Sequence, residues 1–190
     1  LTYAVVEAMT TNETLFFRDT TPFDLFRKVI IPELGARRDL GPVVRIWSAA
    51  CSTGQEAYSL AMIIDEIGSQ LPGKRFEILG TDLSQEVIEK ARAGSYSQFE
   101  VQRGLPVQML VKHFTQSGEQ WRITDRLKQM VKFQNFNLLE DPARLGMFDV
   151  IFCRNVMIYF DMPTKAKVIS SLARRLNSGG VVLLGAAETA

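Results

Sequence analysis

Short apolar runs alternate with amphipathic stretches along most of the chain. The run 43–49 is rich in β-branched residues and follows Gly41 and Pro42, which predicts a strand. In residues 55–69, apolar positions recur at spacings of three and four, which predicts a helix with one buried face. The same signals predict four further strands, at 76–81, 130–136, 148–153 and 181–186, and two further helices, at 85–93 and 163–176. This alternation predicts an α/β fold, a doubly wound and mostly parallel sheet of Rossmann-like type.

Residues 94–129 interrupt the alternation. They predict a short helix near 107–114 and a hairpin over 114–124, so we expect a small antiparallel insertion subdomain at about 94–129. We divide the chain into 1–40, a linker with helices that cap the ligand site, and 41–190, the ligand-binding domain that carries this insertion.

Composition narrows the function classes. A chain of 190 residues with 46% hydrophobic residues suits one core, and a net charge of +1 lacks the basic excess of a nucleic-acid binder. Cys51 and Cys153 lie at the ends of apolar runs and are expected to be reduced buried thiols. His113 is the only histidine, so we expect no metal site. Without a long apolar span or a signal peptide, a cytoplasmic protein is predicted.

In such a sheet, ligands bind beyond the carboxyl ends of the strands. The loop after the first strand contains small residues, Ala49 and Gly54 among them, which let the backbone approach a ligand at a helix N-terminus. A pyrophosphate-binding loop would contain three glycines, whereas this loop has only Gly54 and places Glu56 in the first helical turn. A cationic or zwitterionic ligand fits this loop better than a phosphate. An ordinary strand-to-helix turn would look the same.

The next two strand ends also carry polar groups. Asp82 follows Gly54 by 28 residues, where an acid commonly accepts hydrogen bonds from a ribose diol, although an Asp there also caps a helix. Asn137 and Leu138 follow the third strand and offer an amide beside an apolar shelf, as an adenine edge requires. An Asn that only turns the chain explains that motif equally well.

Two further segments complete the candidate site. The fourth strand runs into Arg154, Asn155 and then Tyr159, which places polar groups at the mouth of the crevice. Ahead of the first strand, Phe16 and Phe17 stand beside Arg18, which suits either a lid over a ligand or core aromatics with a surface arginine.

Four motifs together resemble the CheR-type chemotaxis receptor methyltransferases. They are NETLFFR at 12–18, WSAACSTGQEAYS at 47–59, GTDLS at 80–84 and FCRNVMIYF at 152–160. The resemblance covers nearly the whole chain, in order and at compatible spacing. It implies a class I methyltransferase fold with S-adenosylmethionine as cofactor and S-adenosylhomocysteine as product.

The resemblance also implies a reaction, namely methyl transfer to glutamate side chains of bacterial chemoreceptors to give methyl esters in chemotaxis adaptation. In the family, Asp82 would hold the ribose, Glu56 would face the cationic methionine portion, and Arg18 and Tyr159 would lie nearest the reacting centre. With the two residues of the first loop, the expected cofactor-binding set is Asn12, Thr14, Arg18, Ala49, Gly54, Glu56, Asp82, Asn137, Leu138, Arg154 and Asn155.

The expected partner is the cytoplasmic helical region of methyl-accepting chemoreceptors, with no nucleic acid and no membrane insertion, and we expect a monomer. Two alternatives remain open. A nucleic-acid N-methyltransferase would need prolines after Asn155 and a basic face, and the sequence has neither. A regulatory module that binds S-adenosylmethionine without catalysis would have no need of Arg18, Asn155 and Tyr159.

Overall fold

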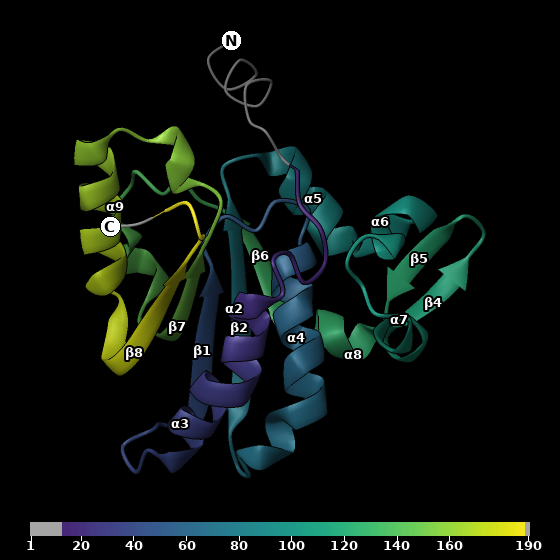
Figure 1. The fold of residues 1–190 in the computed structure, drawn as a ribbon, viewed down its shortest axis with the longest axis horizontal. Coiled ribbons are helices and arrows are strands. Elements are labelled where there is room, and N and C mark those ends of the chain that lie inside the picture. Colours follow the sequence, from purple (N-terminus) through teal and green to yellow (C-terminus); the bar gives the residue numbers. More distant parts are fainter. Residues whose placement is uncertain (1–12, 189–190) are drawn as a thin grey trace.

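The computed structural model describes residues 13–188, and its centre is a five-stranded parallel sheet (Figure 1). The strand order is β6–β2–β1–β7–β8, so chain order reverses at β1. The strands are β1 (Val43–Ser48), β2 (Arg75–Asp82), β6 (Val131–Asn135), β7 (Phe148–Cys153) and β8 (Leu176–Leu184). Each neighbouring pair is parallel, which confirms the predicted doubly wound sheet.

Strand β7 shows why a continuous apolar run forms a central strand here. All six of its residues are buried, because both faces of the sheet are covered. Val150 and Phe152 belong to one core cluster, while Ile151 and Cys153 belong to a second cluster on the opposite face. The two-residue period of a strand thus supplies both cores from one segment.

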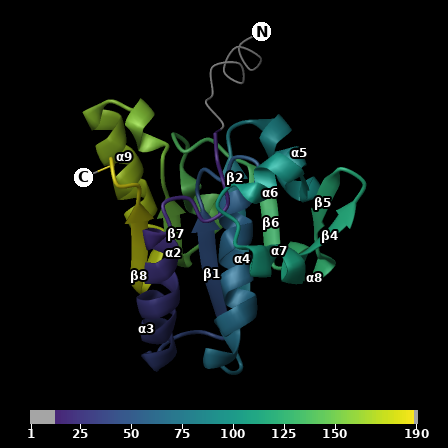
Figure 2. The same cartoon turned by 45° about the vertical axis from the view of Figure 1, so that its right-hand side comes forward.

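Helices cover the two faces unequally (Figure 2). The first cluster receives side chains from a helical run at the N-terminal end and from the two helices that follow β1 and β2. These elements are α2 (Thr21–Leu25), the π-helix η1 (Phe26–Ile30), α3 (Ile31–Ala36), α4 (Gln55–Ile67) with the 3₁₀ turn η2 (Gly68–Gln70), and α5 (Gln85–Ala93). The second cluster is covered by α9 (Met162–Ala173) and the 3₁₀ turns η3 (Pro142–Leu145) and η4 (Met157–Tyr159).

The last strand differs from its prediction. We expected Ser178–Gly180 to separate a helix ending near 176 from a buried strand at 181–186, but α9 already ends at Ala173 and β8 starts at Leu176. Phe148 pairs with Leu176 and Val150 pairs with Val181, so a bulge takes up the intervening residues. Because β8 is the edge strand, most of its residues are half-buried or exposed. The small residues that suggested a break therefore lie within the strand.

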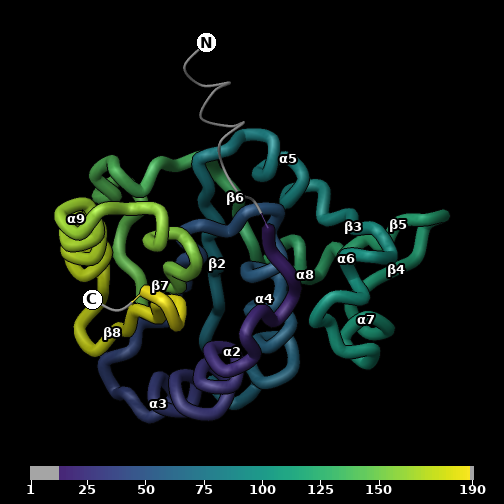
Figure 3. The backbone as a smooth tube through the Cα atoms, turned by 45° about the horizontal axis from the view of Figure 1, so that its top comes forward, coloured from purple at the N-terminus to yellow at the C-terminus, as the bar shows by residue number. Residues whose placement is uncertain are grey.

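The predicted insertion is confirmed as a separate three-stranded antiparallel sheet of order β3–β5–β4, which projects from one side of the main sheet (Figure 3). Its elements are β3 (Ser95–Ser97), α6 (Gln98–Gln102), α7 (Val107–His113), β4 (Phe114–Ser117), β5 (Gln120–Ile123) and α8 (Asp125–Lys128). Asp65 at the end of α4 holds it by ion pairs to Lys112 (3.3 Å) and Arg126 (2.6 Å). Among residues 13–188, no helix has the length and apolar character needed to cross a membrane.

Candidate functional site

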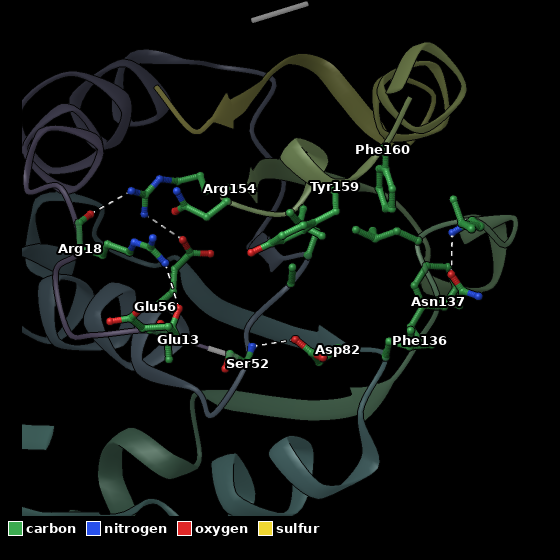
Figure 4. Close-up of a pocket in the computed structure, with 18 of the residues that line it drawn as sticks. Glu13, Arg18, Ser52, Glu56, Asp82, Phe136, Asn137, Arg154, Tyr159 and Phe160 are labelled. Atoms are coloured by element: carbon green, nitrogen blue, oxygen red, sulfur yellow. Dashed lines mark hydrogen bonds and ion pairs between the residues drawn. The ribbon is translucent and has the colours of Figure 1, made fainter. Parts of the chain in front are cut away.

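A pocket of about 450 Å³ opens at the carboxyl ends of β1, β2, β6 and β7, at the point where strand order in the main sheet reverses (Figure 4). The segment 13–18, which we call the strap, closes one side of it. The volume lies within the range of small-molecule sites. The pocket is lined by Glu13, Thr14, Leu15, Arg18, Ala49, Ala50, Ser52, Glu56, Asp82, Leu83, Phe136, Asn137, Leu138, Leu139, Arg154, Asn155, Val156, Tyr159 and Phe160.

The loop between β1 and α4 forms the floor of this pocket. Ala49 and Ser52 are lining residues, whereas Gly54, at the end of the loop, is not one of them. Gly54 has φ +96°, and a Cβ there would lie 3.0 Å from the Ala91 Cβ and 3.1 Å from the Tyr96 Oη. The glycine is therefore required by the turn and by the packing of α5 and the insertion behind it.

Glu56 and Arg154 form a buried ion pair at the base of the pocket. The Arg154 Nη1 donates to the Glu56 Oε2 at 3.0 Å, and the Ser48 Oγ donates to the Oε1 at 2.7 Å. The other end of the guanidinium donates to the Asp19 carboxylate (2.7 Å) and to the backbone carbonyl of Arg18 (2.9 Å). Burial raises the pKa of Glu56, and the charge of Arg154 opposes that shift.

Asp82 stands at the end of β2 with both oxygens oriented by backbone donors. The Ser52 N–H donates to the Oδ2 at 2.8 Å and the Ser84 N–H donates to the Oδ1 at 3.2 Å. Burial raises the pKa of Asp82, and these hydrogen bonds oppose the shift. A carboxylate oxygen accepts more than one hydrogen bond, so Asp82 can also receive donors from a ligand.

The wall after β6 is apolar with one amide. The Phe136 ring is buried and packs edge-on against Trp47, with ring centroids 6.0 Å apart. The Asn137 Oδ1 accepts from the Leu139 N–H at 3.0 Å, while Asn137 and Leu138 both line the pocket. Asn137 therefore turns the chain, and it also lines the pocket.

The loop after β7 carries Asn155 and Tyr159 into the opposite wall. Asn155 has φ +59°, a conformation that Asn adopts more readily than most residues. The backbone N–H groups of Asn155, Val156 and Met157 all donate to the buried carboxylate of Glu188. Tyr159 is 60% exposed, and its hydroxyl points toward the side of the pocket that holds Arg18 and Glu56 (Figure 4).

The sequence left two alternatives for the strap, a lid over a ligand or core aromatic residues beside a surface arginine. The structure combines part of each. Phe16 is fully buried and packs edge-on against Tyr96 and Phe114 of the insertion, at 5.0 and 5.6 Å. Arg18 is half-buried in the pocket lining, and its Nη1 donates to the Glu13 carbonyl at 2.9 Å. The aromatic residue is core, while the arginine faces the pocket.

Most of the residues expected from sequence are brought together here. The lining includes Thr14, Arg18, Ala49, Glu56, Asp82, Asn137, Leu138, Arg154, Asn155 and Tyr159. Asn12 lies outside the described residues. Sequence reasoning missed Asp19, which pairs with Arg154, and Glu188, which accepts from the Asn155 N–H; both partners lie more than 30 residues away in the chain. It also gave no role to Ser52, Phe136 and Phe160, although all three belong to segments that it singled out.

The charges of the lining suit a positively charged ligand. Three carboxylates, of Glu13, Glu56 and Asp82, face two guanidiniums. Burial raises the pKa of both Cys51 and Cys153, so the thiols behind the pocket are protonated at neutral pH. No cluster of three potential metal ligands exists in the described part of the chain. A carboxylate at the end of β2, an apolar shelf and a net negative charge together fit S-adenosylmethionine, a cationic nucleoside.

Comparison with known proteins gives the same result. The family model for the CheR methyltransferase, SAM binding domain, matches residues 12–190. Chemotaxis protein methyltransferase Cher2 of Pseudomonas putida is 42% identical over 188 residues, which are 97% of this chain and 68% of that protein. A chemotaxis protein methyltransferase of Vibrio parahaemolyticus is 43% identical over 192 residues, 100% of this chain and 69% of that protein.

Among solved structures, PKMT2 from Rickettsia typhi superimposes with a TM-score of 0.53 at 18% identity, covering 90% of this chain and 26% of that one. This likeness supports the fold, while the sequence matches support the family and its chemotaxis function. The chain belongs to the CheR family of S-adenosylmethionine-dependent chemotaxis methyltransferases.

Proposed function

We propose that the chain methylates side-chain carboxylates of glutamates in the cytoplasmic helical region of methyl-accepting chemoreceptors. One observation carries the proposal. Arg18 and Tyr159 stand together at the mouth of an acid-lined pocket, and no histidine lines that pocket among residues 13–188. A guanidinium beside a phenol suits an anionic acceptor that needs no proton removed.

Bound S-adenosylmethionine supplies an electrophilic methyl group on a sulfonium. The acceptor glutamate is ionised at neutral pH, since its unperturbed pKa is about 4.3. No side chain of this protein therefore has to take a proton, and the task of the site is alignment and exclusion of water. We assign Arg18 the role of orienting the carboxylate through paired N–H donors. We assign Tyr159 a positioning contact and a hydrogen bond at the same carboxylate.

The cofactor contacts follow from the same geometry. Asp82 is proposed to bind the ribose and Asn137 the adenine edge beside Leu138. Thr14, Ala49 and Asn155 are proposed to contact the cofactor directly, and Asn12 is included on the family resemblance alone. Gly54 contributes through the shape of its turn, as described above.

Glu56 is proposed to attract the methionine ammonium group while it is paired with Arg154. An ion pair at the base of the pocket places a carboxylate and a guanidinium where a zwitterionic amino-acid portion needs one of each. The pairing therefore adds a second contact to the one that was expected of Glu56 alone.

The remaining proposals concern organisation. Residues 1–40 are proposed to cap the cofactor site and 41–190 to form the methyltransferase domain, in accord with the pocket contacts of the strap. We further propose a cytoplasmic monomer that acts on receptors without entering the membrane and without binding nucleic acid.

The test is transfer of a tritiated methyl group to receptor-enriched membranes. We expect labelled receptor that loses its counts as methanol in mild base, because carboxyl methyl esters hydrolyse there. Base-stable label on nucleic acid would identify an N-methyltransferase instead. Binding of S-adenosylhomocysteine without any transfer would identify a regulatory module.

A further inference from the structure

We propose that Glu188 is a positioning residue that fixes the substrate side of the pocket through the backbone of residues 155–157. This inference rests on the proposed function of that side of the pocket. Glu188 is 2% exposed, an unusual degree of burial for a carboxylate, and sequence reasoning gave it no role.

The Glu188 carboxylate accepts four backbone N–H groups. Its Oε2 accepts from Asn155 and Gly185, both at 2.8 Å, and its Oε1 accepts from Val156 and Met157, both at 2.6 Å. Three consecutive amides after β7 therefore point at one side chain that follows β8. Such contacts are charge-assisted and stronger than bonds between neutral groups.

This pattern requires a carboxylate. Each oxygen accepts two N–H groups, so both ends of the side chain must be acceptors. In Glu188→Gln the side chain would keep its length, but its NH₂ would face two N–H donors and leave them unsatisfied. Glu188→Asp would keep the charge, but its side chain would be one methylene shorter and would not bring the carboxylate to the N–H groups of residues 155–157.

The Glu188 carboxylate and its four N–H donors, which we call the clamp, hold the wall that carries Asn155, a proposed cofactor contact, and Tyr159, a proposed substrate contact. Asn155 is held at φ +59° and lines the pocket, and the next turn of chain, η4, carries Tyr159. The Tyr159 side chain is exposed and its hydroxyl has no hydrogen-bond partner among the described residues, while its backbone N–H donates to the Val156 carbonyl at 3.2 Å, so the position of the ring follows from the backbone beneath it. The floor of the pocket depends on other contacts, those of Asp82 with Ser52 and of Glu56 with Arg154.

Gly185 gives an independent way to disturb the clamp. A Cβ at Gly185 would lie 2.5 Å from the Glu188 Oε2 and 3.1 Å from the Asn155 nitrogen. Gly185→Ala would therefore push the carboxylate away from the loop without changing any charge. The two variants share no change in chemistry, so a common phenotype points to the geometry of the loop.

The experiment compares Glu188→Gln and Gly185→Ala with the parent chain of 190 residues. For both variants we expect kcat for receptor methylation to fall by about 10- to 100-fold, since misplacement of about 1 Å has this effect. The Kd for S-adenosylhomocysteine, measured by calorimetry, should stay within about fivefold. Hydrogen exchange in the free protein should rise in peptides that cover residues 154–160 and stay unchanged in peptides confined to 55–67.

Asp161→Asn is the matched control. It also converts a carboxylate that accepts a backbone N–H, from Thr164 at 2.9 Å, but it caps α9 outside the pocket. We expect parent values for kcat and for exchange at 154–160. Parent kcat in both clamp variants, or exchange that rises equally across α4, would overturn the inference. If the parent chain itself esterifies no receptor, the proposed function fails, and the exchange measurement still decides whether Glu188 fixes the loop.

Discussion

The floor and the mouth of the pocket are built differently. On the floor, the side chains of Glu56, Asp82 and Arg154 each make two or more hydrogen bonds within the protein. At the mouth, Tyr159 is 60% exposed, and the one side-chain bond of Arg18 within residues 13–188 goes to a backbone carbonyl. The floor is organised before a ligand arrives, whereas the mouth keeps donors available for one.

This difference fits two ligands of different kinds. The cofactor is the same molecule in every cycle, so a prearranged floor lowers the cost of ordering groups when it binds. The acceptor is a side chain on another protein, and the mouth must receive it and release it. Substitutions at the mouth should therefore affect turnover, while substitutions on the floor should affect stability and cofactor affinity.

The largest effect is expected for Arg18→Ala. Removing the paired donors should lower kcat/KM for receptor methylation by about 100-fold, because the carboxylate loses its orientation in the transition state. The Kd for S-adenosylhomocysteine should change far less. Arg18→Lys, which keeps the charge without the fork, should recover only part of the activity. Steady-state kinetics with parent-like turnover in Arg18→Ala would remove this residue from the mechanism.

On the floor, Arg154→Met should mainly affect stability. It leaves Glu56, whose side chain is 12% exposed, without its buried partner, which should lower the free energy of unfolding by about 3 kcal/mol. Urea denaturation measures this loss. The control is Lys28→Met, which removes a pair to Asp24 in which both side chains are more than half exposed, and stability there should change by less than about 0.5 kcal/mol. Equal losses in both variants would show that burial of the pair is not decisive.

A smaller effect tests whether the insertion supports the floor. The Tyr96 hydroxyl donates at 2.7 Å to the carbonyl of Thr53, in the loop between β1 and α4. Tyr96→Phe should lower the free energy of unfolding by about 1 kcal/mol and weaken S-adenosylhomocysteine binding by about threefold. Tyr58→Phe is matched, since its hydroxyl donates to the Ala91 carbonyl at 2.8 Å, away from that loop. It should lose similar stability and keep its affinity in calorimetry, and weaker binding in Tyr58→Phe alone would contradict the assignment.

The smallest effect concerns pH and the joint between the insertion and α4. Burial lowers the pKa of His113, the charge of Lys112 lowers it further, and Asp65 opposes both. The unfolded chain therefore takes up a proton at a higher pH than the folded chain. Stability should fall as pH drops from 7 toward 5, and His113→Gln should reduce that slope in melting experiments. An unchanged slope would mean that the carboxylates alone set the acid limit.

The sequence predicted the fold well where one local signal was sufficient. The spacing in α4 and the continuous apolar run of β7 each led to an element of the right type and place. The β8 strand was misjudged because its bulge depends on the register with β7, which no local pattern records. Small residues there predicted a break where the strand continues.

The candidate site could also be predicted from local signals, but only in part. Strand ends reveal which residues reach the pocket, so Asp82, Arg154 and Tyr159 could be selected in advance. Their pairings could not. Glu56 meets Arg154 across 98 positions of the chain, and Glu188 meets Asn155 across 33. Such contacts depend on the order of strands in the sheet, which alternation alone does not determine.

Two adjacent phenylalanines anchor the strap to different parts of the molecule. Phe16 packs against Tyr96 and Phe114 in the insertion, whereas Phe17 packs against Phe23 on the helical run over the main sheet. The strap therefore joins the insertion to the helical layer of the main sheet through one ring on each side. A displacement of the insertion's sheet would therefore be transmitted through Phe16 to the position of Arg18, which follows it by two residues and lines the pocket.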